Sequence, residues 1–257
     1  RGLGDVYKRQ VHYTREYFNS YPDNIMAVRL SADQAGKISF DTNLENLING
    51  TAYTNTVDGD TITMRDALST NGLNVEAQLK VINEGGSLST GTNGGNPAIT
   101  VSGADAVTLI FACGTDYKME LPNFRGEDPH KAVTARIDAA AKKGYEALKA
   151  DHIADHSALF SRVELGFDEE IPQIPTDELI KKYRNMIENN GGDIPTSAEQ
   201  RALEIMCYQF GRYLTIAGSR DGALPTNLQG VWGEGWFTWY GDCLLYTSPS
   251  PRDKRQS

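Results

Sequence analysis

The residues best suited to chemistry gather in one short segment, residues 224–242. The three tryptophans of the chain fall within eight residues of one another there, with glycines between them. Aromatic faces stack on the C–H faces of sugar rings, and the amides of Asn227 and Gln229 can hydrogen-bond sugar hydroxyls. The segment therefore predicts a carbohydrate contact by Trp239, Trp236, Asn227 and Gln229. The alternative is that tryptophans of this segment anchor a loop to the core, and Trp232 is the candidate for that role.

Two other patterns carry weaker signals. His152 and His156 have the i, i+4 spacing of a zinc-binding helix, but Ile153 stands where that motif has Glu and no third ligand is near. We interpret them as part of a polar helix face. Cys207 lies beside apolar positions at helical spacing, which predicts a buried structural thiol. No serine nucleophile elbow, phosphate loop or dinucleotide fingerprint occurs in the sequence, so neither a metal nor a cofactor is expected.

Composition excludes several classes of protein. The chain has 257 residues, a net charge of -9, 39% hydrophobic and 23% charged residues, which is typical of a folded globular protein. The acidic balance without a basic cluster argues against binding nucleic acid or an anionic membrane surface. No apolar run is long enough for a membrane-spanning helix. The three cysteines form neither a disulfide framework nor a zinc pattern.

The first half of the chain has the pattern of β-strands. Residues 61–65 and 73–81 alternate polar and apolar side chains, which is typical of strands with one buried and one solvent-exposed face. Residues 106–112 are apolar nearly throughout and predict a strand buried on both faces. Turns are expected at Gly59, Gly72 and Gly85-Gly86.

The second half has the pattern of helices. Asp128 followed by Pro129 predicts a helix start, and the helix should run to about residue 150. A short helix over 151–161 and a strand over 162–167 are expected next. Two further helices begin near Thr176 and Thr196, and the last one should end near Gly218. Strands followed by helices indicate an α+β chain of more than one domain.

Both ends of the chain have an unusual origin in the DNA. Residues 1–10 (RGLGDVYKRQ) and 243–251 (CLLYTSPSP) can be encoded by complementary strands of one DNA stretch, which matches an adapter used in sequencing libraries. Natural protein termini have no reason to share this relation. We therefore expect residues 1–10 and 243–257 to be adapter-derived tails, and we exclude them from fold reasoning.

Three motifs resemble a known family. They are YTREYFNSYP at residues 13–22, HSALFSRV at 156–163 and YQFGRYLTIAGSRDGALPTNLQGVW at 208–232. Together, and in this order, they are similar to glycoside hydrolase family 95, the α-L-fucosidases. Between the tails, the resemblance implies the C-terminal part of an N-terminal β-sandwich (11–118), a helical linker (119–174) and the truncated start of an (α/α)6 catalytic barrel (175–242).

The resemblance also implies an activity. It is the inverting hydrolysis of terminal α-L-fucosyl linkages in oligosaccharides or glycans, by a protein that is secreted or periplasmic. The family's acid and base carboxylates, and an Asn-x-Asn pair that holds the water, match no position in residues 11–242, Glu234 and Asp242 included. No catalytic residue is therefore named, and the chain alone is expected to be inactive. Alternatives are an α-L-galactosidase, another (α/α)6 glycosidase, or a non-catalytic carbohydrate-binding β-sandwich. Oligomeric state stays open.

Overall fold

The computed structural model describes residues 10–45, 53–165, 173–189 and 198–221 of the chain. The chain divides into two compact units between Asp155 and His156. We call the described residues 10–155 the β-unit and the described residues 156–221 the helical unit, and we describe each by itself. None of the helices in the described ranges has the length and apolar character needed to cross a membrane.

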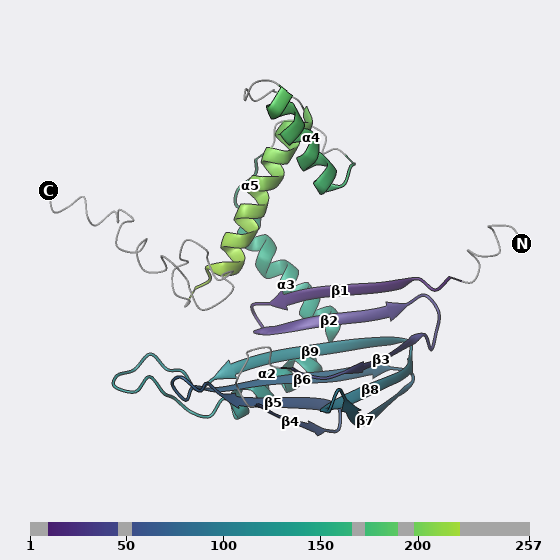
Figure 1. Cartoon of the computed structure of the whole chain (residues 1–257), viewed down its shortest axis with the longest axis vertical. Helices are drawn as coiled ribbons and strands as arrows, with labels where there is room; N and C mark the ends of the chain where they lie inside the picture. The colour runs from purple at the N-terminus through teal and green to yellow at the C-terminus, as the bar shows by residue number, and fades with distance from the viewer. Residues whose placement is uncertain (1–9, 46–52, 166–172, 190–197, 222–257) are drawn as a thin grey trace, which may run out of the picture. The chain divides into compact units, whose positions relative to one another are not determined.

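Two antiparallel sheets form the β-unit (Figure 1). The strands are β1 (Tyr13–Ser20), β2 (Ile25–Ala32), β3 (Ile38–Thr42), β4 (Tyr53–Asp58), β5 (Thr61–Ala67), β6 (Asn74–Glu84), β7 (Ser87–Asn93), β8 (Asn96–Ala104) and β9 (Ala106–Thr115). The larger sheet has the order β1-β2-β9-β6-β5-β4, and the smaller one has the order β3-β8-β7. The apolar strand β9 therefore lies at the centre of the larger sheet, as its sequence predicts.

The two faces of the larger sheet bury two separate cores. Between the sheets, side chains such as Ile62, Val81 and Val107 pack against Ile99 and Val101 of β8. On the opposite face, side chains of the sheet pack against side chains of two helices. This second core comprises Ile25, Ala27, Ile110 and Ala112 from the strands, and Val133, Ile137, Ala140 and Leu148 from the helices. Burial of apolar area on both faces is the main source of stability for such a layered unit.

Glycines make two of the close connections possible. Gly86, between β6 and β7, has a φ of 62°, and an added Cβ would lie 2.3 Å from the carbonyl oxygen of Ser102. Only glycine fits that turn. Gly144 has a φ of 82° and its N–H donates to the carbonyl of Ala140 at 3.1 Å, which ends one helix and starts the next.

The helices α2 (His130–Lys143) and α3 (Tyr145–Phe160) follow the sheets. The Tyr145 hydroxyl donates to Glu16 of β1 at 2.8 Å, and Lys149 lies 2.5 Å from the same carboxylate. These two contacts lower the pKa of Glu16, with the Lys149 hydrogen bond the larger cause. The His152 ring stacks on Phe18 with a centroid distance of 5.0 Å. Together, these contacts attach the first part of α3 to the sheet edge at β1.

The helical unit contains the end of α3 with α4 (Thr176–Asn189) and α5 (Ala198–Gly218). Arg212 of α5 donates to the carbonyls of Phe160 at 2.5 Å and Val163 at 2.8 Å. Its guanidinium carbon also lies 4.5 Å from the centre of the Phe160 ring. One arginine therefore connects α5 to the end of α3, and it belongs to a motif that carries the family resemblance.

Several sequence predictions are confirmed. Strands form over the predicted runs, Asp128 accepts the backbone N–H of His130 at 2.8 Å at a helix start, and α5 ends at Gly218.

Four predictions are wrong. The helix break falls at Gly144 instead of residue 150, because that glycine has a positive φ. Residues 162–165 form no strand. Cys207 is exposed, because few described side chains cover that face of α5.

The fourth error concerns β6. Alternation places Glu76 and Gln78 on a solvent-exposed face, but both side chains are buried. The physical reason is that α2 covers this face of the sheet: Thr134 of α2 contacts Gln78, at 2.8 Å.

Candidate functional site

The four sequence-predicted substrate residues lie outside the described residues. Trp239, Trp236, Asn227 and Gln229 all fall within residues 222–257. Their role in sugar contact therefore stays a prediction. His152 and His156 lie within the described part, where each ring stacks on an aromatic side chain, Phe18 and Phe160 respectively. In the described ranges, no group of His, Cys, Asp and Glu is arranged to hold a metal ion.

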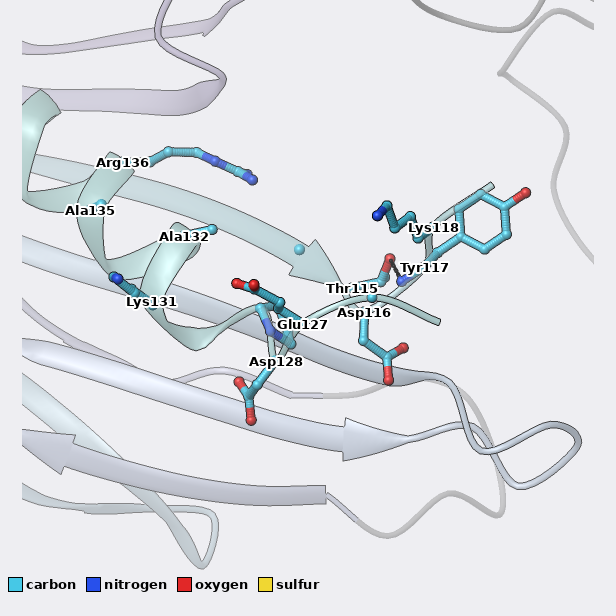
Figure 2. Close-up of a pocket in the computed structure, with 13 residues that line it drawn as sticks. Thr115, Asp116, Tyr117, Lys118, Glu127, Asp128, Lys131, Ala132, Ala135 and Arg136 are labelled. Carbon is cyan, nitrogen blue, oxygen red and sulfur yellow. Dashed lines mark hydrogen bonds between the residues drawn. The ribbon is translucent and has the colours of Figure 1, made fainter. Parts of the chain in front are cut away.

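The larger of two described pockets opens where β9 ends. Its volume is about 490 Å³, and it lies between the end of β9, the following loop and the first half of α2 (Figure 2). This volume is in the range of small-molecule sites. Its charged lining residues are Asp116, Lys118, Glu127, Asp128, Lys131 and Arg136. The sequence reasoning missed this pocket, because its walls come from segments that are separated along the chain.

Asp116, which is only 6% exposed, holds the loop side of the pocket in place. Its carboxylate accepts the Nδ2–H of Asn74 at 2.6 Å and the backbone N–H of Asn74 at 3.1 Å. Arg125 completes the set, with its Nε at 3.7 Å from Asp116. The backbone N–H of Gly126 donates to the Asp116 carbonyl at 2.6 Å, which closes the base of the loop. The carboxylate of Asp116 is therefore engaged in structure.

The helix side of the pocket depends on a buried carboxylate, Glu76 of β6. Its side chain is fully buried. Its Oε1 lies 2.6 Å from Nε2 of Gln78 and 2.8 Å from Nδ1 of His130, the first residue of α2. The Nε of Arg65 lies 3.1 Å from Oε2, but this contact is not aligned as a hydrogen bond. A buried charge is costly unless partners surround it, so Glu76 ties α2 to the sheet at one defined position.

Asp128 extends this network to the pocket wall. Its carboxylate accepts the backbone N–H of His130 and lies 2.5 Å from Arg65. Two hydrogen bonds hold the pKa of Asp128 below its ordinary value. The one from the His130 N–H is the larger cause, and the one from the Arg65 guanidinium is the second. Asp128 is therefore negatively charged at neutral pH and occupied by its own structural contacts.

Close packing at Gly114 brings α2 against the end of β9. A Cβ at Gly114 would lie 2.9 Å from Cγ2 of Val133 and 3.4 Å from Cβ of Pro129. A larger residue would therefore displace the start of α2 and change the width of the pocket.

The remaining charged groups define what the pocket can do. Figure 2 shows Arg136 extending from α2 and Lys118 from the loop toward the space between them, while the Glu127 carboxylate points toward the start of α2. Arg136 donates from Nη1 to the Cys113 carbonyl at 3.0 Å, which leaves its other N–H groups for a ligand. Within the described part of the chain, Glu127 has no hydrogen-bond or ion-pair partner. The pocket thus combines free donors with a free acceptor, and this set suits binding.

A second, smaller pocket of about 300 Å³ lies among β1, β2 and β3. Tyr13, Arg15 and Lys37 are among the residues that line it, and the Tyr13 hydroxyl donates to the Lys37 carbonyl at 3.4 Å. It brings together aromatic, cationic and hydroxyl groups but has no carboxylate in its lining. It therefore lacks the acceptor that the larger pocket has.

Two family models match the chain. Residues 6–120 match the N-terminal domain of glycosyl hydrolase family 65, and residues 144–244 match the catalytic domain of glycosyl hydrolase family 95. The first match covers the strands of the β-unit, and the second covers α3 to α5 and the aromatic segment. Both descriptions are of glycoside hydrolases.

Curated relatives point the same way. The chain is 32% identical over 244 residues to a "Probable alpha-fucosidase A" of Aspergillus niger, covering 91% of this chain and 29% of that protein. It is 28% identical to "Alpha-L-fucosidase 2" of Arabidopsis thaliana, covering 86% of this chain and 28% of that protein. A solved structure of a putative kojibiose phosphorylase from human microbiome covers 58% of this chain at 9% identity and a TM-score of 0.40, which is too low to support an argument.

By class, these similarities are to glycoside hydrolases. In particular, the chain resembles the α-fucosidases of glycoside hydrolase family 95, as the three sequence motifs predict. The chain spans less than a third of the length of either curated relative.

Proposed function

We propose that this chain is part of an inverting exo-glycosidase that hydrolyses terminal α-L-fucosyl linkages of oligosaccharides or glycans. The observation that carries the proposal is the 32% identity to a protein named as a probable alpha-fucosidase, over 91% of the chain. That alignment is long enough to include residues of both the β-unit and the helical unit. A likeness restricted to the β-unit would have favoured a carbohydrate-binding module.

The proposed arrangement has three parts between adapter-derived tails at 1–10 and 243–257. Residues 11–118 are the C-terminal part of a β-sandwich, residues 119–174 link it to the next domain, and residues 175–242 begin an (α/α)6 barrel. In this arrangement α4 and α5 are barrel helices. The enzyme is secreted or periplasmic.

In the proposed mechanism, a carboxylic acid protonates the leaving oxygen and a carboxylate activates a water molecule on the opposite face of the sugar. Both groups, and an Asn-x-Asn pair that positions the water, belong to chain beyond residue 242. The roles within this chain are substrate contacts. Trp239 and Trp236 stack on the sugar, and Asn227 and Gln229 hydrogen-bond its hydroxyls.

The test uses the full-length protein. It should hydrolyse an aryl α-L-fucoside, and proton NMR should show the β-anomer of L-fucose as the first product, because inversion changes the anomeric configuration. Hydrolysis of the α-L-galactoside in preference to the fucoside would favour the galactosidase alternative. Retention of configuration, or turnover by the 257-residue chain free of host enzyme, would contradict the mechanism as proposed.

A further inference from the structure

The pocket at the end of β9 is formed entirely by residues of the β-unit, between Gly114 and Arg136. We propose that it binds one neutral saccharide unit without hydrolysing it. The choice of saccharides as the ligand class rests partly on the proposed function. The residues that line the pocket include none of the residues predicted to contact substrate in the aromatic segment.

The balance of charge favours a neutral ligand. Three cationic and three anionic side chains line the pocket. Asp116 and Asp128 are engaged by Asn74, Arg125, Arg65 and the backbone of His130, so neither is free to hold a ligand cation. Lys118 lies 2.8 Å from Glu120, which offsets its charge. Lys131 also lines the pocket, but its side chain points away from Arg136 and Glu127 (Figure 2). The charged groups left for a ligand are therefore the Glu127 carboxylate and the N–H groups of Arg136 that Cys113 does not use.

A sugar diol fits this pair of groups. Each hydroxyl both donates and accepts hydrogen bonds, so one hydroxyl can donate to the Glu127 carboxylate while its neighbour accepts from Arg136. Hydrogen bonds to charged groups are stronger than those between neutral groups. A phosphate would meet the Glu127 carboxylate, and a metal ion would meet Arg136 and Lys118. The mixed set therefore disfavours both kinds of ion.

The helix supplies an apolar wall. Ala132, Ala135 and Pro129 line the pocket along α2. A pyranose ring has a C–H face as well as its hydroxyl edge, and small alanine side chains let that face approach the helix closely. The pocket thus offers a polar side and an apolar side to one ring, and its volume is large enough for it.

The walls are already fixed in place. The loop is held by Asp116 and Gly126, and the start of α2 is held by the buried Glu76. A preformed site loses less conformational entropy on binding than one that must order itself. This is why the network beneath the pocket supports a binding role.

The test measures binding, so it does not depend on activity. The 257-residue chain is titrated with L-fucose, L-galactose and D-glucose by calorimetry and saturation-transfer NMR, with D-galacturonic acid and inorganic phosphate as charged probes. We expect saturable binding of at least one neutral sugar. Binding of the charged probes alone, or of none of the probes, would overturn the proposal.

Matched variants locate the site. Ala132→Leu fills the pocket from an exposed position of α2, whereas Ala139→Leu makes the same change at an exposed position outside it. We expect Ala132→Leu to weaken binding at least about tenfold and Ala139→Leu to leave it unchanged. Glu127→Gln, which keeps the side-chain volume, should also weaken binding by about tenfold through loss of a charged hydrogen bond. Asp138→Asn is its control.

If Ala132→Leu lowers the melting temperature, the Glu127→Gln result decides, because that change alters no volume. Equal affinity in Glu127→Gln and in wild type would place the sugar elsewhere and end the proposal. A fucosidase assay that fails leaves this result untouched, because glucose and galactose binding are read independently of fucose hydrolysis.

Discussion

The β-unit and the helical unit differ in how much apolar surface each one buries. The β-unit has two clusters of buried side chains, one on each face of its larger sheet. Among the described residues of the helical unit, Leu179 and Ala202 are the buried hydrophobic side chains, while Tyr208, Phe210 and Tyr213 are exposed. Exposed apolar patches of this kind mark surfaces that normally have a partner.

This difference in buried apolar surface indicates which unit can specify its own fold. In the β-unit, local patterns and tertiary packing agree, because each strand has a neighbour that covers it. In the helical unit, the apolar pattern of α5 is clear, but its described neighbours, α4 and the end of α3, cover only part of it. We therefore expect the β-unit to dominate the free energy of unfolding, and the helical unit to tolerate changes on its exposed face.

The largest expected effect comes from deleting core volume in the β-unit. Ile110 of β9 is 1% exposed and packs against α2. Ile110→Ala should lower the free energy of unfolding by about 2–5 kcal/mol, through lost burial and a residual cavity. Phe210→Ala in α5, where the residue is 60% exposed, should change it by less than about 0.5 kcal/mol. Urea denaturation monitored by circular dichroism measures both, and comparable losses would contradict a larger stabilising core in the β-unit.

The buried carboxylate should give the next largest effect. Glu76→Gln removes the charge that His130 and Arg65 surround, and it replaces one acceptor oxygen with an NH2 donor that must face the donor of either Gln78 or Arg65. The expected loss is about 1–3 kcal/mol, the range for leaving buried polar groups without partners. Glu120→Gln, in an exposed pair with Lys118, is the control and should change stability very little. A loss of equal size in the control would show that burial is not the cause.

The sequence predicted the most apolar and most regularly alternating strands but missed three others, among them β8 at the centre of the smaller sheet. The apolar run of β9 and the alternation of β5 identified strands, because core residues must be apolar. The edge strands β4 and β7 were missed, since most of their residues, such as Thr54, Asn55 and Ser89, are polar. Gly144 could have indicated the helix break, but the alanine-rich residues around it favour a helix, and the predicted helix therefore continued to residue 150.

Long-range contacts explain why the pocket could not be predicted. Glu76 reads as a solvent-exposed strand residue until α2, more than fifty positions away, covers it. Arg65 and Asp128, which form an ion pair, are 63 positions apart. Asp116 and Arg136 share a pocket only because Gly114 lets α2 return close to β9. Periodicity describes one element at a time and contains none of these pairings.

A substitution in the aromatic segment should separate function from stability. In the full-length protein, Trp239→Ala should lower kcat/KM by about 2–13-fold, which corresponds to about 0.5–1.5 kcal/mol of stacking energy. Trp232→Ala, at the position predicted to anchor the segment, should mainly lower the melting temperature. Steady-state kinetics and thermal unfolding of both variants check this. The reverse pattern would mean that the two tryptophans have exchanged roles.

Acid should weaken the β-unit through its ion pairs. Glu16, Asp60, Glu84 and Asp128 all belong to this unit, and each has a lowered pKa. Because the folded-state pKa lies below the unfolded one, the stabilisation is complete above the unfolded value, near 4, and is lost as the pH falls through the folded value.

Glu84 offers the cleanest test of this acid effect, because a hydrogen bond from Arg29 is the main cause of its lowered pKa. The pair is partly exposed, so its contribution is only about 0.2–1 kcal/mol. Glu84→Gln should therefore reduce the difference in Tm between pH 7 and pH 3. An unchanged pH dependence of Tm would show that the Arg29–Glu84 pair does not contribute to the loss of stability in acid.

The smallest expected effect concerns the predicted tails. If residues 1–10 and 243–257 have adapter origin, nothing has selected them to pack against the two units. Within the described residues, the Gln10 carbonyl accepts an exposed hydrogen bond of 3.3 Å from Gln34. Removing both tails takes away that contact, and an exposed hydrogen bond of this length contributes little because water replaces it. The His12 N–H, which donates to Asp33 at 3.0 Å, stays in place to hold the start of β1. Trimming should thus leave Tm unchanged, whereas deletion of residues 1–14, which also removes the start of β1, should lower it. A clear fall in Tm on trimming the tails alone would show that they pack against a unit and would contradict their predicted origin.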